Sequence, residues 1–149
     1  MQNGLITDKN EIVEIMKQTR VCRLGLVNGR QPYVIPMYFG FEIQGEQIIV
    51  WLLCEMKGTK LNIIRENDNA CFEVDVPDTV NGGFRSVVGS GIIKICKIPS
   101  EKHRGLICFM KQYAPQKDFE LSAGAADNVI MLKLKIENII AKRKHEGGK

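Results

Sequence analysis

Apolar and polar residues alternate along most of this chain with the period of β-strands, and turn-forming pairs separate the alternating segments. In the run VIMLKLKIENII, Leu132 and Leu134 fall on one face and Lys133 and Lys135 on the other. Such alternation is typical of a strand with one face on a core. By this criterion we expect six strands, at residues 21–27, 32–39, 47–53, 70–76, 84–98 and 129–140.

Glycine-containing pairs set the connections between these strands. Asn28-Gly29 supplies the two positive-φ positions of a type I′ turn and predicts a hairpin between the first two strands. Gln44-Gly45 separates the second strand from the third. Gly89 and Gly91 lie inside the fifth strand, where they predict a bulge or a sharp bend. A bend of this kind lets a sheet curl into a barrel.

Three segments have the period of short helices. Asp8 and Glu11 have the spacing of a helix start and predict a helix at residues 9–17. A second helix surrounds Leu61 and ends near residue 67. A third opens at Pro99, with Ser100 as its cap, and ends before residue 115. The segment at 116–128 is ambiguous and could hold a helical turn and a loop.

The order of these elements predicts a mainly β protein, a six-stranded antiparallel β-barrel with short helices covering its ends. A length of 149 residues, 44% of them hydrophobic, suits one domain over residues 1–149. The basic end at 141–149 is expected to fray, because it is charged and contains Gly147-Gly148.

Composition and charge exclude several classes of function. The five cysteines are odd in number and at least 12 residues apart, which is not the spacing of a zinc site or a disulfide framework. With only two histidines, we expect no metal site. Most of the net charge of +4 lies in residues 142–149, so the rest of the chain lacks the basic patch of a nucleic-acid-binding protein. No apolar run approaches the roughly 20 residues that span a bilayer, and no signal peptide is visible, so we expect a cytoplasmic protein without a membrane partner.

A candidate binding site lies where the third strand ends and the second helix begins, at Gly58-Thr59-Lys60. In a structural interpretation, Gly58 ends the strand, Thr59 caps the helix and Lys60 is solvated. In a binding interpretation, the free N–H groups of the helix start, the Thr59 hydroxyl and the Lys60 ammonium hold a phosphate. The three residues lack the full phosphate-loop pattern, so taken alone they leave both interpretations open.

Longer motifs narrow this choice. The segments CRLGLVNGRQPYVIPMYFGF, IIVWLLCEMKGTKL, NACFEVD, RSVVGSG and EKHRGLICFMKQYAP occur in this order along the chain. Together they resemble the pyridoxamine phosphate oxidase-related FMN-binding split barrels, and within them the NimA-like branch, named for nitroimidazole resistance. The resemblance covers residues 21–113 and extends to the closing strand. It implies a split-barrel fold, bound FMN, and a homodimer with a flavin at each subunit interface.

The resemblance also implies which residues bind the cofactor. The second strand would lay its backbone along the isoalloxazine ring, and Gly58-Thr59-Lys60 would receive the phosphate. Leu53 and Cys54 would line the ring, and Ser86 would add a polar contact. Arg85 would support the phosphate or would form an exposed ion pair instead. The expected cofactor-binding set is Val34, Ile35, Pro36, Met37, Tyr38, Leu53, Cys54, Gly58, Thr59, Lys60, Arg85 and Ser86.

Departures from the family pattern bear on the chemistry. NimA-like chains often carry a histidine at the end of the third strand, but this chain has Leu53, which cannot ligate or transfer a proton. The C-terminal arginine and histidine motif of true pyridoxamine phosphate oxidases is also missing, which disfavours vitamin B6 oxidation. No side chain qualifies as an obligate general acid or base, although Tyr38 and Cys54 are candidates for nearby proton donors.

The leading hypothesis is therefore an FMN-dependent oxidoreductase that reduces nitroaromatic or other small electron acceptors with electrons from NADH or NADPH. The chain has no dinucleotide fingerprint, so a nicotinamide donor would bind transiently. A flavin-binding carrier, sensor or storage protein without turnover is the second hypothesis. A haem-binding barrel ranks last, because a cysteine would be its one plausible axial ligand.

Overall fold

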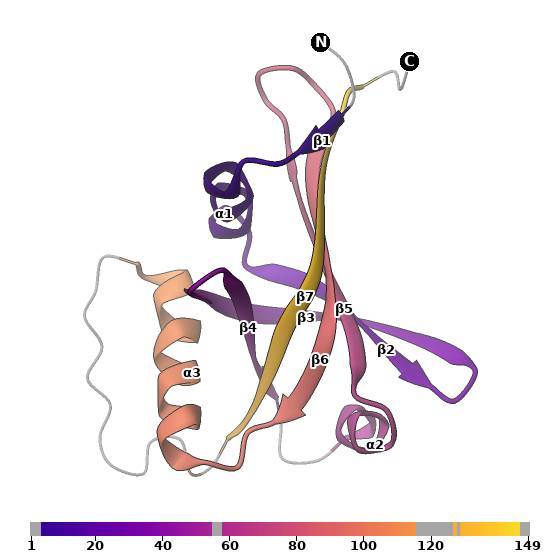
Figure 1. Cartoon of the computed structure of the whole chain (residues 1–149), viewed down its shortest axis with the longest axis vertical. Coiled ribbons are helices and arrows are strands. Elements are labelled where there is room, and N and C mark those ends of the chain that lie inside the picture. The colour runs from indigo at the N-terminus through magenta and orange to yellow at the C-terminus, as the bar shows by residue number, and fades with distance from the viewer. Residues whose placement is uncertain (1–3, 55–57, 116–126, 128, 147–149) are drawn as a thin grey trace.

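Strand β7 closes the sheet, because its length lets it pair with three other strands (Figure 1). The computed structural model describes residues 4–54, 58–115, 127 and 129–146. Along the chain the elements are β1 (Gly4–Ile6), α1 (Lys9–Lys17), β2 (Val21–Asn28), β3 (Gln31–Gln44), β4 (Gln47–Cys54), α2 (Thr59–Glu66), β5 (Asn69–Pro77), β6 (Phe84–Ile95), α3 (Pro99–Tyr113) and β7 (Ile130–Lys144).

The described strands form one antiparallel sheet in the order β1-β7-β4-β3-β2-β5-β6, and a further pairing of β7 with β6 closes six of them into a ring. The predicted six-stranded antiparallel barrel is thus confirmed, with β1 as an additional strand outside the ring. Three predicted strand ends were clearly misplaced: β3 continues to Gln44, β6 ends at Ile95, and β7 continues to Lys144. The ambiguous segment at 116–128 lies, except for Asp127, outside the described residues.

The predicted fraying of the basic end is wrong for residues 141–144. They belong to β7, where Arg143 pairs with Gly4 of β1 on one side and with Arg85 of β6 on the other. The Arg143 guanidinium also donates to Glu11 Oε2 at 2.6 Å. Two neighbouring strands and an ion pair therefore hold a segment that its charge and the nearby Gly147-Gly148 had suggested to be loose.

The predicted irregularity near Gly89 and Gly91 is confirmed. The register between β6 and β7 shifts between Ser90 and Gly91, as at a β-bulge. A Cβ on Gly91 would lie 1.8 Å from the Lys135 carbonyl oxygen, so a larger residue could not let the two backbones approach in this way. The bulge increases the local twist and helps the sheet to close.

The hairpin between β2 and β3 forms, but its turn differs from the predicted type I′. Asn28 pairs with Gln31, so the two central residues are Gly29 and Arg30. Gly29 has φ of 62°, and no described residue other than glycine has positive φ. Positive φ at the first central position alone is the pattern of a type II′ turn, which also suits the right-handed twist of a hairpin.

Local signals placed one helix start correctly and another one incorrectly. Asp8 precedes α1, and its Oδ1 accepts a hydrogen bond from the Asn10 N–H at 2.9 Å, as expected for a cap. Ser100 does not cap α3: Ile98 precedes the helix and Pro99 is its first residue, where the missing proline N–H costs nothing. No helix of the described residues is both long and apolar enough to cross a bilayer.

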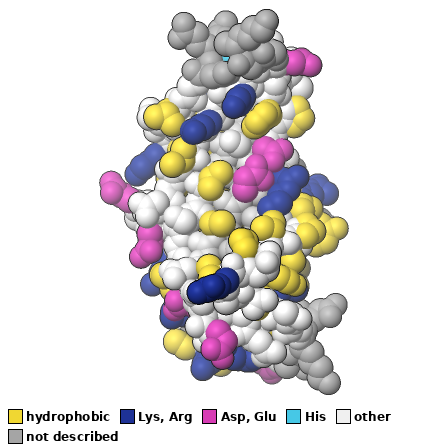
Figure 2. All heavy atoms as spheres, turned by 90° about the vertical axis from the view of Figure 1, so that its right-hand side faces the viewer, with side chains coloured by type: hydrophobic (Ala, Val, Ile, Leu, Met, Phe, Trp, Pro, Cys, Tyr) yellow, Lys and Arg dark blue, Asp and Glu magenta, His cyan; other side chains and the backbone are white. Residues whose placement is uncertain are grey.

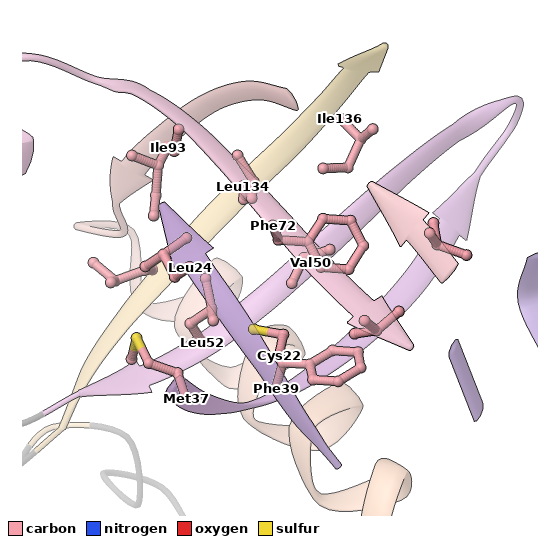
Figure 3. Packing of buried hydrophobic residues seen from close by; sticks show 14 of the residues in the cluster. Cys22, Leu24, Met37, Phe39, Val50, Leu52, Phe72, Ile93, Leu134 and Ile136 are labelled. Carbon is pink, nitrogen blue, oxygen red and sulfur yellow. The ribbon is translucent and has the colours of Figure 1, made fainter. Parts of the chain in front are cut away.

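The core fills the inside of the ring, where side chains from facing strands meet (Figure 3). Phe39 and Phe72 are fully buried, with ring centroids 6.3 Å apart. Strand β4 is buried on its outer face too, because α3 covers Trp51 there. A Cβ on Gly105 of α3 would lie only 2.4 Å from the Trp51 ring, so this glycine lets the helix sit directly on the strand.

Candidate functional site

A cavity of about 680 Å³ opens where the end of β4, the middle of β3 and the start of α2 meet α3. Six of the residues predicted to bind a cofactor line it: Pro36, Met37, Tyr38, Leu53, Cys54 and Lys60. Three further lining residues were not predicted: Val21, Phe109 and Val129. The volume falls in the range of small-molecule sites, and most of the lining side chains are apolar.

Strand β3 contributes to the cavity from both of its faces. Met37 points into the barrel core and is 9% exposed, whereas the neighbouring Tyr38 points outward and is 61% exposed. Val34 is also outward and 65% exposed, and Ile35 is half-buried. Neither Val34 nor Ile35 lines the cavity, so within this chain the predicted strand contributes through its second half.

The start of α2 provides the polar part of the site. Gly58 precedes the helix with φ of 149°, a backbone conformation that favours glycine. Thr59 is the first helical residue and makes no capping hydrogen bond, so the structural interpretation in which Thr59 caps this helix is wrong. The first turn contains no acidic residue, and among the described residues no carboxylate pairs with Lys60, which lines the cavity. Positive charge is therefore concentrated here.

Two predicted site residues lie elsewhere in the subunit. Arg85 donates to Glu11 Oε2 at 3.2 Å and lines a separate cavity of about 480 Å³ with Asp78 and Arg143. The ion-pair alternative thus describes Arg85 better than phosphate support does, although its side chain is only 19% exposed. Ser86 stands opposite Asp75 on β5 and Lys142 on β7, and it does not line the 680 Å³ cavity.

A cluster of three aromatic side chains, Tyr38, Phe109 and Tyr113, lies between β3 and α3 beside the cavity. The Tyr113 ring lies edge-on to Tyr38, at 5.8 Å between centroids, and 5.3 Å from Phe109. Burial and the neighbouring Tyr38 raise the pKa of the Tyr113 hydroxyl to about 12, so this group stays neutral. The spacing of Phe109 and Tyr113, one helical turn apart, is the signal that could have identified this side of α3.

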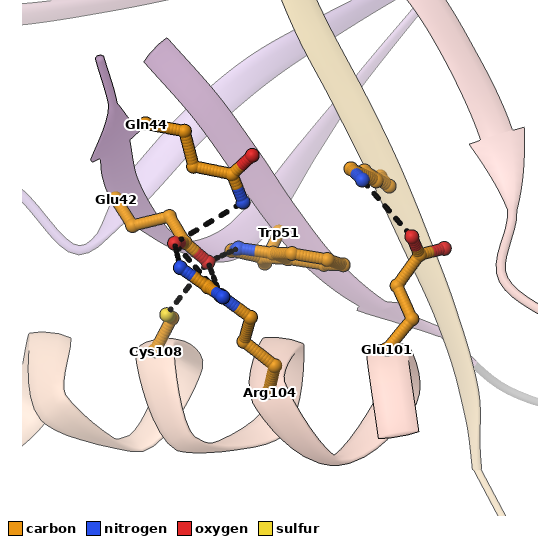
Figure 4. A network of polar contacts seen from close by, with 7 residues as sticks. Glu42, Gln44, Trp51, Glu101, Arg104 and Cys108 are labelled. Atoms are coloured by element: carbon orange, nitrogen blue, oxygen red, sulfur yellow. Dashed lines mark hydrogen bonds and ion pairs between the residues drawn. The ribbon is translucent and has the colours of Figure 1, made fainter. Parts of the chain in front are cut away.

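Glu42 of β3 connects α3 to the barrel through hydrogen bonds to both (Figure 4). Its carboxylate accepts hydrogen bonds from Trp51 Nε1 at 2.9 Å, from Arg104 Nε at 2.9 Å, from Cys108 Sγ at 3.3 Å and from Gln44 Nε2 at 3.3 Å. Burial opposes the charge of Glu42, but these donors outweigh it and lower the pKa of the carboxyl to about 2. Burial and the Glu42 carboxylate raise the pKa of the Cys108 thiol to about 12. The network positions Phe109, which follows Cys108, at the cavity.

Another polar cluster, formed by Arg23, Glu73 and Asp75, lies on the outer face of the barrel. Arg23 of β2 donates to Glu73 at 3.3 Å and to Asp75 at 3.2 Å, both on β5. Partial burial and the adjacent Asp75 carboxyl raise the pKa of Glu73 to about 7. Two carboxylates here share one guanidinium, so the cluster is less completely paired than Glu42.

The family resemblance is confirmed by comparison with family models. The model described as pyridoxamine 5'-phosphate oxidase matches residues 8–143, which is most of the chain. No curated protein matches the chain by sequence.

Solved structures with the same fold come from several bacteria. A candidate 5-nitroimidazole antibiotic resistance protein from Bacteroides thetaiotaomicron is 25% identical, with a TM-score of 0.80 over 95% of this chain and 87% of that one. An FAD-binding protein from Mesorhizobium loti is 18% identical, with a TM-score of 0.67 over 95% and 96% of the two chains. A flavocytochrome from Azotobacter vinelandii is 18% identical, with a TM-score of 0.71 over 95% of this chain and 70% of that one.

Proposed function

The chain belongs to the pyridoxamine 5'-phosphate oxidase family, and we propose that it is a flavoprotein that binds FMN in the cavity between β3, β4 and the start of α2. The observation that carries the proposal is the joining of a largely apolar cavity to a helix start whose Lys60 has no partner among the described carboxylates. A flat apolar ring and an anionic phosphate need these two features side by side.

The phosphate would lie at the start of α2. The first N–H groups of a helix have no intrahelical partners and point toward an anion. Gly58 allows an oxyanion to approach the backbone, the Thr59 hydroxyl does not cap the helix, and Lys60 adds an ammonium group. The isoalloxazine ring would then lie on Pro36 and Tyr38 and reach Leu53 and Cys54. Val34, Ile35, Arg85 and Ser86 would meet a flavin only if a second subunit presented them.

A titration of the purified protein with FMN, FAD and riboflavin tests this assignment. FMN should bind most tightly, since it carries a terminal phosphate, and riboflavin most weakly. Equal affinity for FMN and riboflavin would show that the helix start does not hold a phosphate. A preference for FAD would retain the flavin site and change the cofactor, as in the FAD-binding protein of Mesorhizobium loti.

For the reaction, we propose the reduction of nitroaromatic or other small electron acceptors with electrons from NADH or NADPH. A bound flavin supplies the hydride or electron transfer. The residues of this chain would orient the ring and exclude water from one of its faces, and Tyr38 and Cys54, which line the cavity, would be candidates for nearby proton donors. The similarity to the candidate 5-nitroimidazole resistance protein supports this choice. Bleaching of the flavin by NADH or NADPH, followed by reoxidation with a nitroaromatic, tests it, whereas a flavin that stays oxidised favours a carrier or sensor.

We further propose a homodimer in which a second copy covers the outer face of the barrel next to the cavity. On this side, hydrophobic side chains lie among charged ones (Figure 2). Pro36, Arg23, Glu73, Val88 and Ile140 are successive register partners across five strands. Val88 and Ile140 are 43% and 54% exposed. Arg23 and Glu73 carry opposite charges, and a two-fold axis would place Arg23 of one copy near Glu73 of the other. Light scattering should give twice the chain mass of 16.8 kDa; a monomer that binds FMN would refute this arrangement.

A further inference from the structure

A second positively charged side chain, Arg20, directly precedes the cavity-lining residue Val21, at the junction between α1 and β2. Its guanidinium carbon lies 5.7 Å from the centroid of the Tyr113 ring, in a cation–π arrangement. The Arg20 carbonyl oxygen accepts hydrogen bonds from the Phe39 N–H at 3.3 Å and from the Tyr113 hydroxyl at 3.4 Å. Backbone and side chain are thus both held, although the residue is exposed.

This held side chain lies next to the cavity. The following residue, Val21, lines the cavity, and so do Tyr38 and Phe109, the two aromatic neighbours of Tyr113. The described part of the chain offers Arg20 no carboxylate partner, in contrast to Arg23, three residues further along, which contacts two. An exposed arginine whose movement is limited by a ring contact, and which none of the described carboxylates neutralises, can bind an anion from solution at a reduced entropic cost.

We propose that Arg20 binds an anionic oxygen group of the aromatic acceptor that enters the cavity beside the flavin, so that this site selects planar aromatic acids. The inference rests on the proposed function, in which the phosphate of FMN occupies Lys60. An acceptor that carries its own carboxylate then needs a separate cation, and Arg20 lies against Tyr113, whose ring contacts two aromatic side chains that line the cavity. The guanidinium fork matches the two oxygens of a carboxylate.

Two probes of nearly the same shape, the anionic 4-nitrobenzoate and the neutral 4-nitrobenzamide, test the inference by calorimetric titration into the FMN-loaded protein. We expect the benzoate to bind the natural protein about 10- to 100-fold more tightly than the benzamide, as for a hydrogen bond to a charged group. Arg20→Gln should abolish this preference, and Arg20→Lys should keep part of it. Arg30→Gln, in the exposed turn between β2 and β3, is the matched control and should keep all of it.

The affinity for FMN is measured first in every variant, which separates the two hypotheses. If the natural protein fails to bind FMN, the proposed function is wrong. If FMN binds and the benzoate has no advantage, or if neither probe binds, the Arg20 assignment alone is wrong. An advantage that survives in Arg20→Gln also overturns it, and so does an effect of Arg20→Gln confined to the KM of NADH or NADPH.

Discussion

The carboxylate of Glu42 and the ammonium of Lys60 show opposite ways of placing a charge on one barrel. Glu42 is 13% exposed and accepts hydrogen bonds from four side chains on β3, β4 and α3. Lys60 borders a cavity, and none of the described carboxylates pairs with it. A charge whose partners are supplied by the protein stabilises the fold, whereas a charge without protein partners is available to a ligand. Changes at the two positions should therefore affect different measurements.

Glu42→Ala should have the largest effect on stability. It leaves the buried Trp51 N–H without its acceptor and releases Arg104 and Cys108 of α3. We expect a loss of about 2–3 kcal/mol in the free energy of unfolding, from the cost of an unsatisfied buried donor together with the lost ion pair. Urea denaturation measures the loss, and Glu46→Ala, at a side chain that is 95% exposed, is the control. If both variants unfolded at the same urea concentration, the network would not be what holds α3.

Lys60→Ala should have the converse result. We expect the affinity for FMN to fall by about 1–3 kcal/mol, as for the loss of a charge-assisted hydrogen bond, while the free energy of unfolding without ligand changes by less than about 0.5 kcal/mol. The affinity for riboflavin should not change, because riboflavin has no phosphate. Arg65→Ala, in the last turn of the same helix, is the control for the general charge of α2. An FMN dissociation constant equal to that of the natural protein would remove Lys60 from the site.

The sequence predicted those features that depend on neighbouring residues. Alternation located the strands of the barrel, and Gly91 marked a real bulge. Strand β1 was missed because three residues, Gly4–Ile6, show no period and become a strand only against the end of β7. The same pairing holds Arg143, in the segment that its charge and the following Gly147-Gly148 had suggested would fray.

For the candidate site too, the sequence predicted only what depends on neighbouring residues. The motif around Lys60 is local, and Lys60 and the strand ends predicted beside it do line one cavity, while the binding of FMN there stays a prediction. The contact between Arg20 and Tyr113 was not predicted, because it joins two residues that lie 93 positions apart in the chain. For Arg85 the motif left two alternatives open, phosphate support or an ion pair, and the structure shows an ion pair with Glu11 of the distant helix α1. Long-range partners decide which charges are satisfied, and neither spacing nor periodicity contains that information.

Glu73 is paired less completely than Glu42 and more completely than Lys60. Its replacement should have the smallest effect on stability. Its pKa of about 7 exceeds the ordinary value of 4.5, so between these pH values the folded protein binds more protons than the unfolded chain. Stability consequently falls as the pH rises from 4.5 through 7. Glu73→Gln cannot ionise, so the variant should lose less stability than the natural protein between pH 5 and pH 8. Because the side chain is 33% exposed, we expect a difference below about 1 kcal/mol. Melting temperatures at the two pH values measure it, with Glu46→Gln as control; parallel changes in all three proteins would show that Arg23 already neutralises both carboxylates.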